Sequence, residues 1–157
     1  MSFDLEHALE TARKAARAGA EVALRHFHQG LQVEHKSDDS PVTIADRETE
    51  DAVLAVLQDA FPDFGILGEE TGTHNAEAET RWIVDPIDGT RGYIRGGSNW
   101  GQLIALESKG EIVVGVIHVP VRDEHCYAAR GLGAYRNDTK VEAKVAPADV
   151  NALSLSL

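Results

Sequence analysis

Cysteine, basic charge and long apolar runs are all scarce in this sequence of 157 residues. Cys126 is the only cysteine, so no intrachain disulfide and no cysteine cluster for zinc is available, which favours a reducing compartment. Lys and Arg total 15 against 26 Asp and Glu, and the resulting charge of -11 repels nucleic acids and anionic membranes. The longest mainly apolar run, residues 112–119, is far shorter than a bilayer span, and the acidic N-terminus does not resemble a signal peptide. We therefore expect a cytoplasmic protein whose partners include neither nucleic acid nor membrane.

The rest of the composition is that of an ordinary globular domain. Hydrophobic residues make up 43% and charged residues 26% of the chain, which excludes disordered, collagen-like and coiled-coil proteins. A length of 157 residues suits a single domain. Because the chain is acidic overall, an anionic ligand would need a local binding device, such as a metal ion or a helix terminus.

Two segments have the periodicity of amphipathic helices. Apolar and small residues recur three or four positions apart from residue 5 to about residue 28, with Ser2 or Asp4 as the N-cap. The second helix begins near Thr43 and ends before Pro62, which cannot continue a helix. Each helix therefore has one apolar face that must pack against something else.

Most of the remaining apolar segments predict strands, and a glycine turn at residues 108–110 predicts a hairpin between two of them. We expect residues 71–79 to form a polar surface loop. The predicted strands cover residues 31–35, 63–67, 81–84, 100–106, 111–119, 124–129, 133–135 and 141–145. This order of elements predicts an α+β fold, in which two long helices pack on one face of a mostly antiparallel sheet.

Residues 82–90 are the most informative segment for chemistry. Asp85 and Asp88 are three residues apart, and Pro86 restricts the turn between them, so both carboxylates and the Ile87 carbonyl can point into one small volume. Oxygen ligands of this kind suit Mg²⁺ or Mn²⁺ better than Zn²⁺. The alternative is that Asp-Pro and Asp-Gly are common turn dipeptides and that the two aspartates only cap a turn.

Acids in two other segments could complete such a site. Glu69 and Glu70 follow a predicted strand, although two glutamates in a loop are more often a solvated turn. Thr43 and Asp46 have the spacing of a capping box at a helix start, which is a sufficient structural explanation of both. Both segments therefore have an ordinary structural interpretation beside the functional one.

Gly89 and Thr90 could begin a helical turn that is followed by Arg91. The free N–H groups of such a turn would hold a phosphate beside the acids.

Taken together, these segments resemble the inositol monophosphatase superfamily of metal-dependent, lithium-sensitive phosphatases. Within it, Thr90-Arg91 and residues 100–106 look more like the histidinol-phosphatase branch than the animal inositol monophosphatases. The positions that carry the resemblance are Lys36, residues 40–43, Asp46, residues 68–70, residues 82–90, residues 115–119 and residues 130–134.

The resemblance implies a Mg²⁺-dependent phosphate monoester hydrolase, with Mn²⁺ as the alternative ion. Its substrate would be histidinol phosphate, an inositol phosphate or a related small molecule. Thr90, hydrogen-bonded to Asp46, would orient a water for in-line attack on phosphorus, and the catalytic residues would be Glu69, Asp46 and Thr90. Implied metal ligands are Glu69, Asp85, Ile87 through its carbonyl, and Asp88, with Asp85 shared between two ions. Implied phosphate contacts are Glu69, Ile87, Asp88, Gly89 and Thr90, with Lys36, Glu70 and Arg91 as further contributors.

The resemblance also predicts how the chain is organised. Residues 1–147 would form a sugar-phosphatase-like N-terminal domain that binds metal and phosphate, and residues 148–157 would begin the junction to a C-terminal domain. That second domain, whose Trp-Asp-x-Ala motif carries a further metal ligand in the family, is not in this sequence. We expect an incomplete enzyme whose exposed apolar face makes it a homo-oligomer. The alternatives are a non-catalytic metal- and phosphate-binding half or regulatory module, and a plain structural domain.

Overall fold

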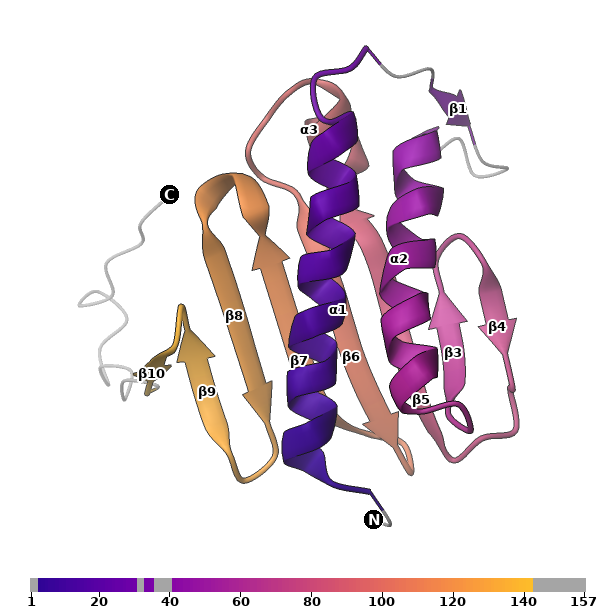
Figure 1. Ribbon diagram of the computed structural model, residues 1–157, viewed down its shortest axis with the longest axis vertical. Coiled ribbons are helices and arrows are strands. Elements are labelled where there is room, and N and C mark those ends of the chain that lie inside the picture. Colours follow the sequence, from indigo (N-terminus) through magenta and orange to yellow (C-terminus); the bar gives the residue numbers. More distant parts are fainter. Residues whose placement is uncertain (1–2, 31–32, 36–40, 143–157) are drawn as a thin grey trace, which may run out of the picture.

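The fold is taken from a computed structural model that describes residues 3–30, 33–35 and 41–142. Two long helices, α1 (Leu5–His26) and α2 (Ile44–Ala60), lie side by side across one face of a broad sheet (Figure 1). This sheet has eight strands in the order β10-β9-β8-β7-β6-β5-β3-β4 and is called the large sheet below. Its strands are β3 (Gly65–Gly68), β4 (Gly72–His74), β5 (Thr80–Asp88), β6 (Gly101–Ser108), β7 (Glu111–Val119), β8 (Glu124–Ala129), β9 (Gly133–Arg136) and β10 (Thr139–Val141).

The predicted α+β fold is confirmed. Neighbouring strands of the large sheet are antiparallel except β3 and β5, which run parallel. The remaining described elements are short: a separate pair of β1 (Glu34–His35) and β2 (Pro41–Val42), a helical turn α3 (Thr90–Ile94), and a 3-10 turn η1 (Pro120–Arg122). No helix in the described ranges combines the length and the hydropathy of a membrane span.

Both long helices begin where the sequence predicted a cap. The Asp4 side chain accepts a hydrogen bond from the backbone N–H of Glu6 at 2.8 Å, which satisfies one of the free donors of the first turn. Thr43 forms the predicted capping box with Asp46 at the start of α2. The start of α2 therefore follows from a local signal in the sequence.

Several predicted boundaries were wrong. The first helix ends at His26 rather than His28, because Phe27 already has an extended conformation with ψ of 130°. The predicted loop 71–79 contains β4, whose pairing with β3 uses backbone groups that leave no side-chain pattern. The last strand begins at Thr139, and residues 143–145 of the predicted strand lie outside the described residues, as do residues 31–32 of the first one.

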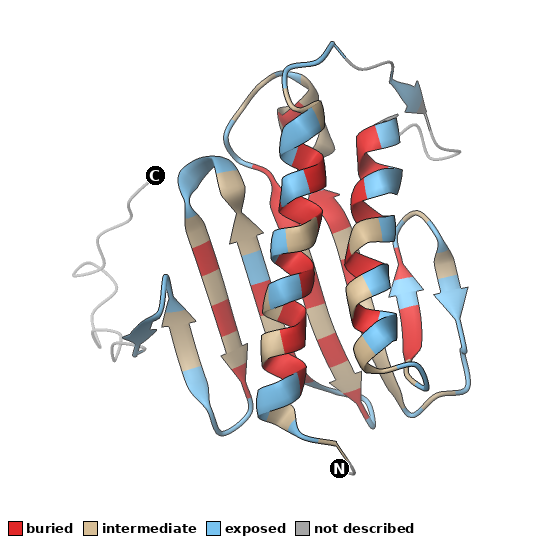
Figure 2. Ribbon diagram, viewed as in Figure 1, coloured by how far each residue is buried: buried red, intermediate tan, exposed pale blue. Residues whose placement is uncertain are grey.

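The core lies between the two helices and the large sheet (Figure 2). Trp82 on β5 and Leu106 on β6 are fully buried there, and Leu57 meets them from α2. A second, smaller cluster lies beside α3 and consists of Ala23, Ala45, Ile87, Tyr93 and Trp100. This second cluster matters for function because it contains Ile87, which the sequence analysis placed among the candidate site residues.

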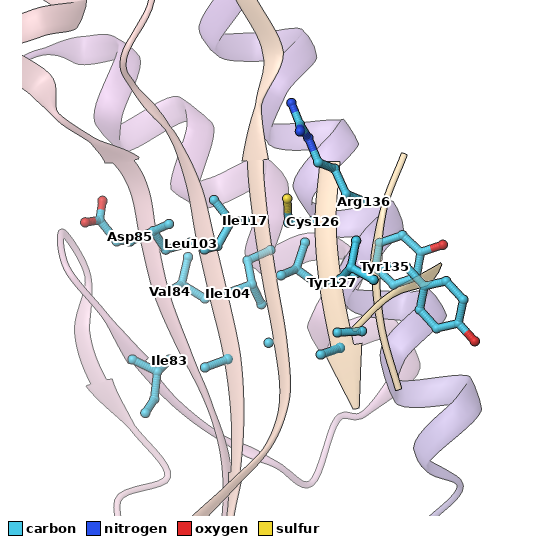
Figure 3. A pocket seen from close by; sticks show the side chains of 16 residues that line it. Ile83, Val84, Asp85, Leu103, Ile104, Ile117, Cys126, Tyr127, Tyr135 and Arg136 are labelled. Carbon is cyan, nitrogen blue, oxygen red and sulfur yellow. The ribbon is translucent and has the colours of Figure 1, made fainter. Parts of the chain in front are cut away.

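The other face of the large sheet is covered by no helix of the described chain. Residues such as Leu103 and Ile117 alternate with the buried core positions and line a mainly apolar hollow of about 660 Å³ on this open face (Figure 3). Asp85 lies at one end of the hollow. Asp85 therefore borders the open face of the sheet.

Candidate active site

The end of β5 carries two candidate aspartates on either side of a buried anchor. β5 pairs with β6 in regular register as far as Asp85, and the register then shifts before Asp88 pairs with Gly101. Ile87 is only 1% exposed, so its side chain fixes this irregular segment in the second cluster. The shift leaves Asp88 exposed and Asp85 half-buried.

Asp85 is the electrostatic centre of the site. Burial, a hydrogen bond with Glu69 and the negative charges of Glu69 and Asp88 raise the pKa of Asp85 to about 8. Its Oδ1 atom is buried and has no hydrogen-bond partner among the described residues. The structure therefore brings together Glu69, Asp85 and Asp88, and this group of carboxylates has more negative charge than its protein surroundings neutralise.

The chemistry of these donors fits the implied Mg²⁺. An unpartnered carboxylate oxygen beside two further acids suits a hard cation, which would also relieve the repulsion between them. Across the described residues, no three His, Cys, Asp or Glu side chains form a complete metal cage. Mg²⁺ usually binds through one or two carboxylates together with waters and substrate phosphates, so an incomplete protein cage fits this ion.

Asp46 makes the contacts of both interpretations that the sequence left open. Its Oδ2 accepts hydrogen bonds from the Thr43 backbone and hydroxyl, each at 2.7 Å, which is the helix cap. Its Oδ1 lies 3.2 Å from Thr90 Oγ1, which also lies 3.0 Å from the Ile87 carbonyl. The predicted contact between Thr90 and Asp46 is therefore confirmed, and the same carboxylate caps α2.

The helical turn predicted at Gly89 and Thr90 is confirmed as α3. Gly89 has φ of +86°, and a Cβ there would lie 2.8 Å from the Asn99 carbonyl oxygen, so only glycine fits without strain. The backbone N–H of Gly92 closes the turn on the Gly89 carbonyl at 2.8 Å. Asp88, Gly89 and Thr90 therefore form a rigid corner directly after β5.

The three further contributors have different outcomes. Lys36 lies outside the described residues. Arg91 is exposed on α3. Glu70 is half-buried, and its backbone N–H donates to Glu50 at 2.9 Å, which ties it to the structure around the site.

Two supporting residues escaped the sequence analysis. Glu50 is fully buried on α2 and accepts hydrogen bonds from the Thr71 backbone at 2.8 Å and the Thr71 hydroxyl at 2.6 Å, so it holds the turn that carries Glu69. Gln102, also fully buried, donates to the Pro86 carbonyl at 3.2 Å and supports the end of β5. The available signal for Glu50 was its position one helical turn after Asp46, on the same face of the helix.

Comparison with known proteins shows the same family as the motifs. Residues 4–157 match the model of the inositol monophosphatase family. The chain belongs to this family. Among its relatives, a histidinol-phosphatase from Chlorobaculum parvum is 43% identical over 143 residues, which is 90% of this chain and 54% of the relative. An inositol-1-monophosphatase from Mesorhizobium japonicum is 40% identical over 138 residues, which is 87% of this chain and 50% of the relative.

Solved structures of the inositol monophosphatase family share the fold. The extragenic suppressor protein suhB from Bartonella henselae has a TM-score of 0.81 and 38% identity, with 87% of this chain and 54% of that chain covered. An inositol monophosphatase from Thermotoga maritima has a TM-score of 0.77 and 30% identity, with 89% and 53% covered. The chain thus spans about half the length of the family members it matches.

Proposed function

We propose that the protein is a Mg²⁺-dependent phosphate monoester hydrolase, with Mn²⁺ as an alternative ion. The observation that carries the proposal is the position of Asp85, whose unpartnered oxygen lies within a group of acids at the end of β5. The substrate would be a small phosphate ester, and histidinol phosphate and inositol phosphates are the first candidates because relatives with those names match. We also expect a cytoplasmic homo-oligomer.

The residues would act in distinct ways. Glu69, Asp85, Asp88 and the Ile87 carbonyl would hold the ions, which when bound would lower the pKa of a water and polarise the phosphoryl oxygens. Thr90 Oγ1 donates its proton within the protein, to Asp46 or to the Ile87 carbonyl. Its lone pairs are then free to accept a proton from a water and orient it for in-line attack. Gly89 and Thr90 N–H groups would contact the phosphate as charge spreads over its oxygens.

The first test measures the metal. Calorimetric titration with Mg²⁺ should show binding that Asp85→Asn weakens about tenfold or more, because the variant loses a charged ligand. Asp63→Asn is the matched control, since Asp63 is exposed on the turn before β3. Equal titration curves for the two variants would argue against the metal site.

The second test measures turnover. Release of inorganic phosphate from histidinol phosphate and inositol 1-phosphate should require Mg²⁺ and fall strongly in Thr90→Ala. Asp46→Asn should lose turnover while Thr43→Ala, which weakens the same cap without touching Thr90, should lose stability alone by about 0.5–2 kcal/mol. A loss of stability with unchanged turnover in Asp46→Asn would overturn the catalytic role of Asp46.

A second candidate function is binding of metal and phosphate without turnover. Such a module would bind the metal through the same acids, Glu69, Asp85 and Asp88. The two candidates separate cleanly: a non-catalytic module would show Mg²⁺ binding in calorimetry and no phosphate release from any of the esters.

A further inference from the structure

A second hollow, which is polar, lies away from the candidate active site, on the helix-covered face of the large sheet. Its volume is about 220 Å³, and it is open to solvent between α1 and the paired ends of β7 and β8. The residues that line it are Arg17, His118, Asp123, His125, Asn137 and Asp138. The proposed phosphatase chemistry uses none of them.

Two histidines face each other in this hollow. His118 on β7 and His125 on β8 are cross-strand partners, and their ring centroids lie 4.8 Å apart with the rings nearly perpendicular, at 86°. His125 is only 9% exposed, yet neither of its ring nitrogens has a hydrogen-bond partner among the described residues. Nδ1 of His118 is also buried without a partner. Buried polar atoms are rarely left unpaired, so three such nitrogens in one place indicate a binding role.

Two of the neighbouring side chains form hydrogen bonds with groups other than these nitrogens. Asn137 accepts from the His125 backbone N–H at 2.8 Å and donates to the Asp123 carbonyl at 2.7 Å. The Asp138 Oδ1 atom accepts from Arg13 and from the Tyr127 hydroxyl, each at 2.7 Å. Both histidines line the hollow together with the exposed residues Arg17 and Asp123.

The Nδ1 atom of His118 is one of the buried unpartnered nitrogens, so a neutral ring with its proton on Nε2 would present a lone pair there to a cation. Burial lowers the pKa of both His118 and His125, so both imidazoles are neutral near neutral pH. Neutral imidazole nitrogen is a ligand for zinc and neighbouring transition metals and a poor one for Mg²⁺.

We propose that His118 and His125 form a binding site for a divalent transition metal cation of the Zn²⁺ type, with the Asp123 carboxylate and water completing its coordination. No group of three His, Cys, Asp or Glu side chains in the described part of the chain is placed to hold a metal ion, so the Asp123 carboxylate would have to move to join the two imidazoles. Asp123 is exposed and lines the same hollow, so its carboxylate can turn inward while the exposed Arg17 turns out to solvent. The ion would join β7 and β8, which carry the two histidines.

The test is calorimetric titration of the whole chain with Zn²⁺ in millimolar Mg²⁺, in the wild type and in an Asp85→Asn background that weakens the carboxylate site. We expect about one equivalent of Zn²⁺ in both, and a loss of affinity of about tenfold or more in His118→Gln and in His125→Gln. His74→Gln is the matched control, because His74 is exposed on β4, away from the hollow. Thermal melting in chelator should show which variants are folded before metal is added.

Ring-nitrogen NMR shifts provide a second readout that needs no variant. Zn²⁺ should shift Nδ1 of His118 and one nitrogen of His125 while leaving His74 unmoved. The proposal is overturned if neither ring shifts, or if binding is unchanged in both His118→Gln and His125→Gln. In that case an ordered water fills the hollow and satisfies the rings.

Discussion

The two faces of the large sheet have similar sequences and different surroundings. On β6, Leu106 faces the helices and is fully buried, whereas Leu103 faces the open side and lines the hollow there. Both positions are leucine, and buried and half-buried residues alternate along the strand between them. Alternation therefore determines which side chains share a face, while the elements packed on that face determine how much each side chain stabilises the fold.

Truncating each of these two leucines is the most direct test of the difference between the two faces. Leu106→Ala should lower the free energy of unfolding by about 2–5 kcal/mol, because it leaves a cavity in the core. Leu103→Ala, the same change on the same strand, should cost about 1 kcal/mol or less in the isolated chain. Urea unfolding of both variants measures the difference. Equal losses would mean that the open face is covered in solution.

Glu50 tests whether the covered face supports the site. Removing its side chain in Glu50→Ala leaves the N–H groups of Glu70 and Thr71 without their acceptor, which should cost about 2–3 kcal/mol of stability. Mg²⁺ affinity should fall as well, because the turn that carries Glu69 loses its anchor. Asp51→Ala, at the exposed neighbouring position, is the control and should change neither quantity.

The histidine pair makes the covered face sensitive to acid. Burial, followed by the charges of His118, Arg17 and Arg13, lowers the pKa of His125 to about 4 from its ordinary value of 6.5. The unfolded chain therefore binds more protons than the folded chain between these values, so stability is full above pH 6.5 and declines as the pH falls toward 4. In metal-free protein we expect a loss on the order of 1–2 kcal/mol from this group. His125→Gln should flatten the decline measured by urea unfolding across this pH range, and an unaltered slope would contradict the assignment.

The smallest effect on stability is expected on the open face. Ile117→Lys, at a position that is 49% exposed, should change the free energy of unfolding by about 0.5 kcal/mol or less. It should nevertheless reduce self-association, because it puts a charge into the apolar hollow. Ile112→Lys is the control, since Ile112 is 55% exposed and does not line the hollow. Sedimentation velocity measures both, and a wild-type monomer would show that the predicted homo-oligomer is wrong.

Local patterns predicted the fold well where the side chains carry the information. The periodicity of α1 and α2, the cap at Thr43 and the alternation of β6 and β7 each identified an element. They did not identify β4, which is a short edge strand of mostly exposed residues held by backbone hydrogen bonds to β3. The end of α1 was misplaced because its apolar periodicity continues to Phe27, where the backbone has already left the helix.

Only some residues of the candidate site could be predicted from the sequence. Asp85, Asp88 and Gly89 could be singled out because they combine turn chemistry with family resemblance. Glu50 was missed, because the helical spacing from Asp46 does not reveal the hydrogen bond that it accepts from Thr71, 21 residues away. The histidine pair also escaped notice, since His118 and His125 become neighbours only when β7 and β8 pair.

Asp46 links the start of α2 to Thr90, which lies 44 residues further along the chain. Its carboxylate caps the first turn of α2 and accepts a hydrogen bond from the Thr90 hydroxyl. A movement of Asp46 away from the cap would therefore also break its contact with Thr90. Fraying of a helix start is ordinarily a local event with a small free energy. Here it would also release Thr90, so amide hydrogen exchange at Asp46 and at Gly92 should follow the same opening event and slow together when the site is occupied.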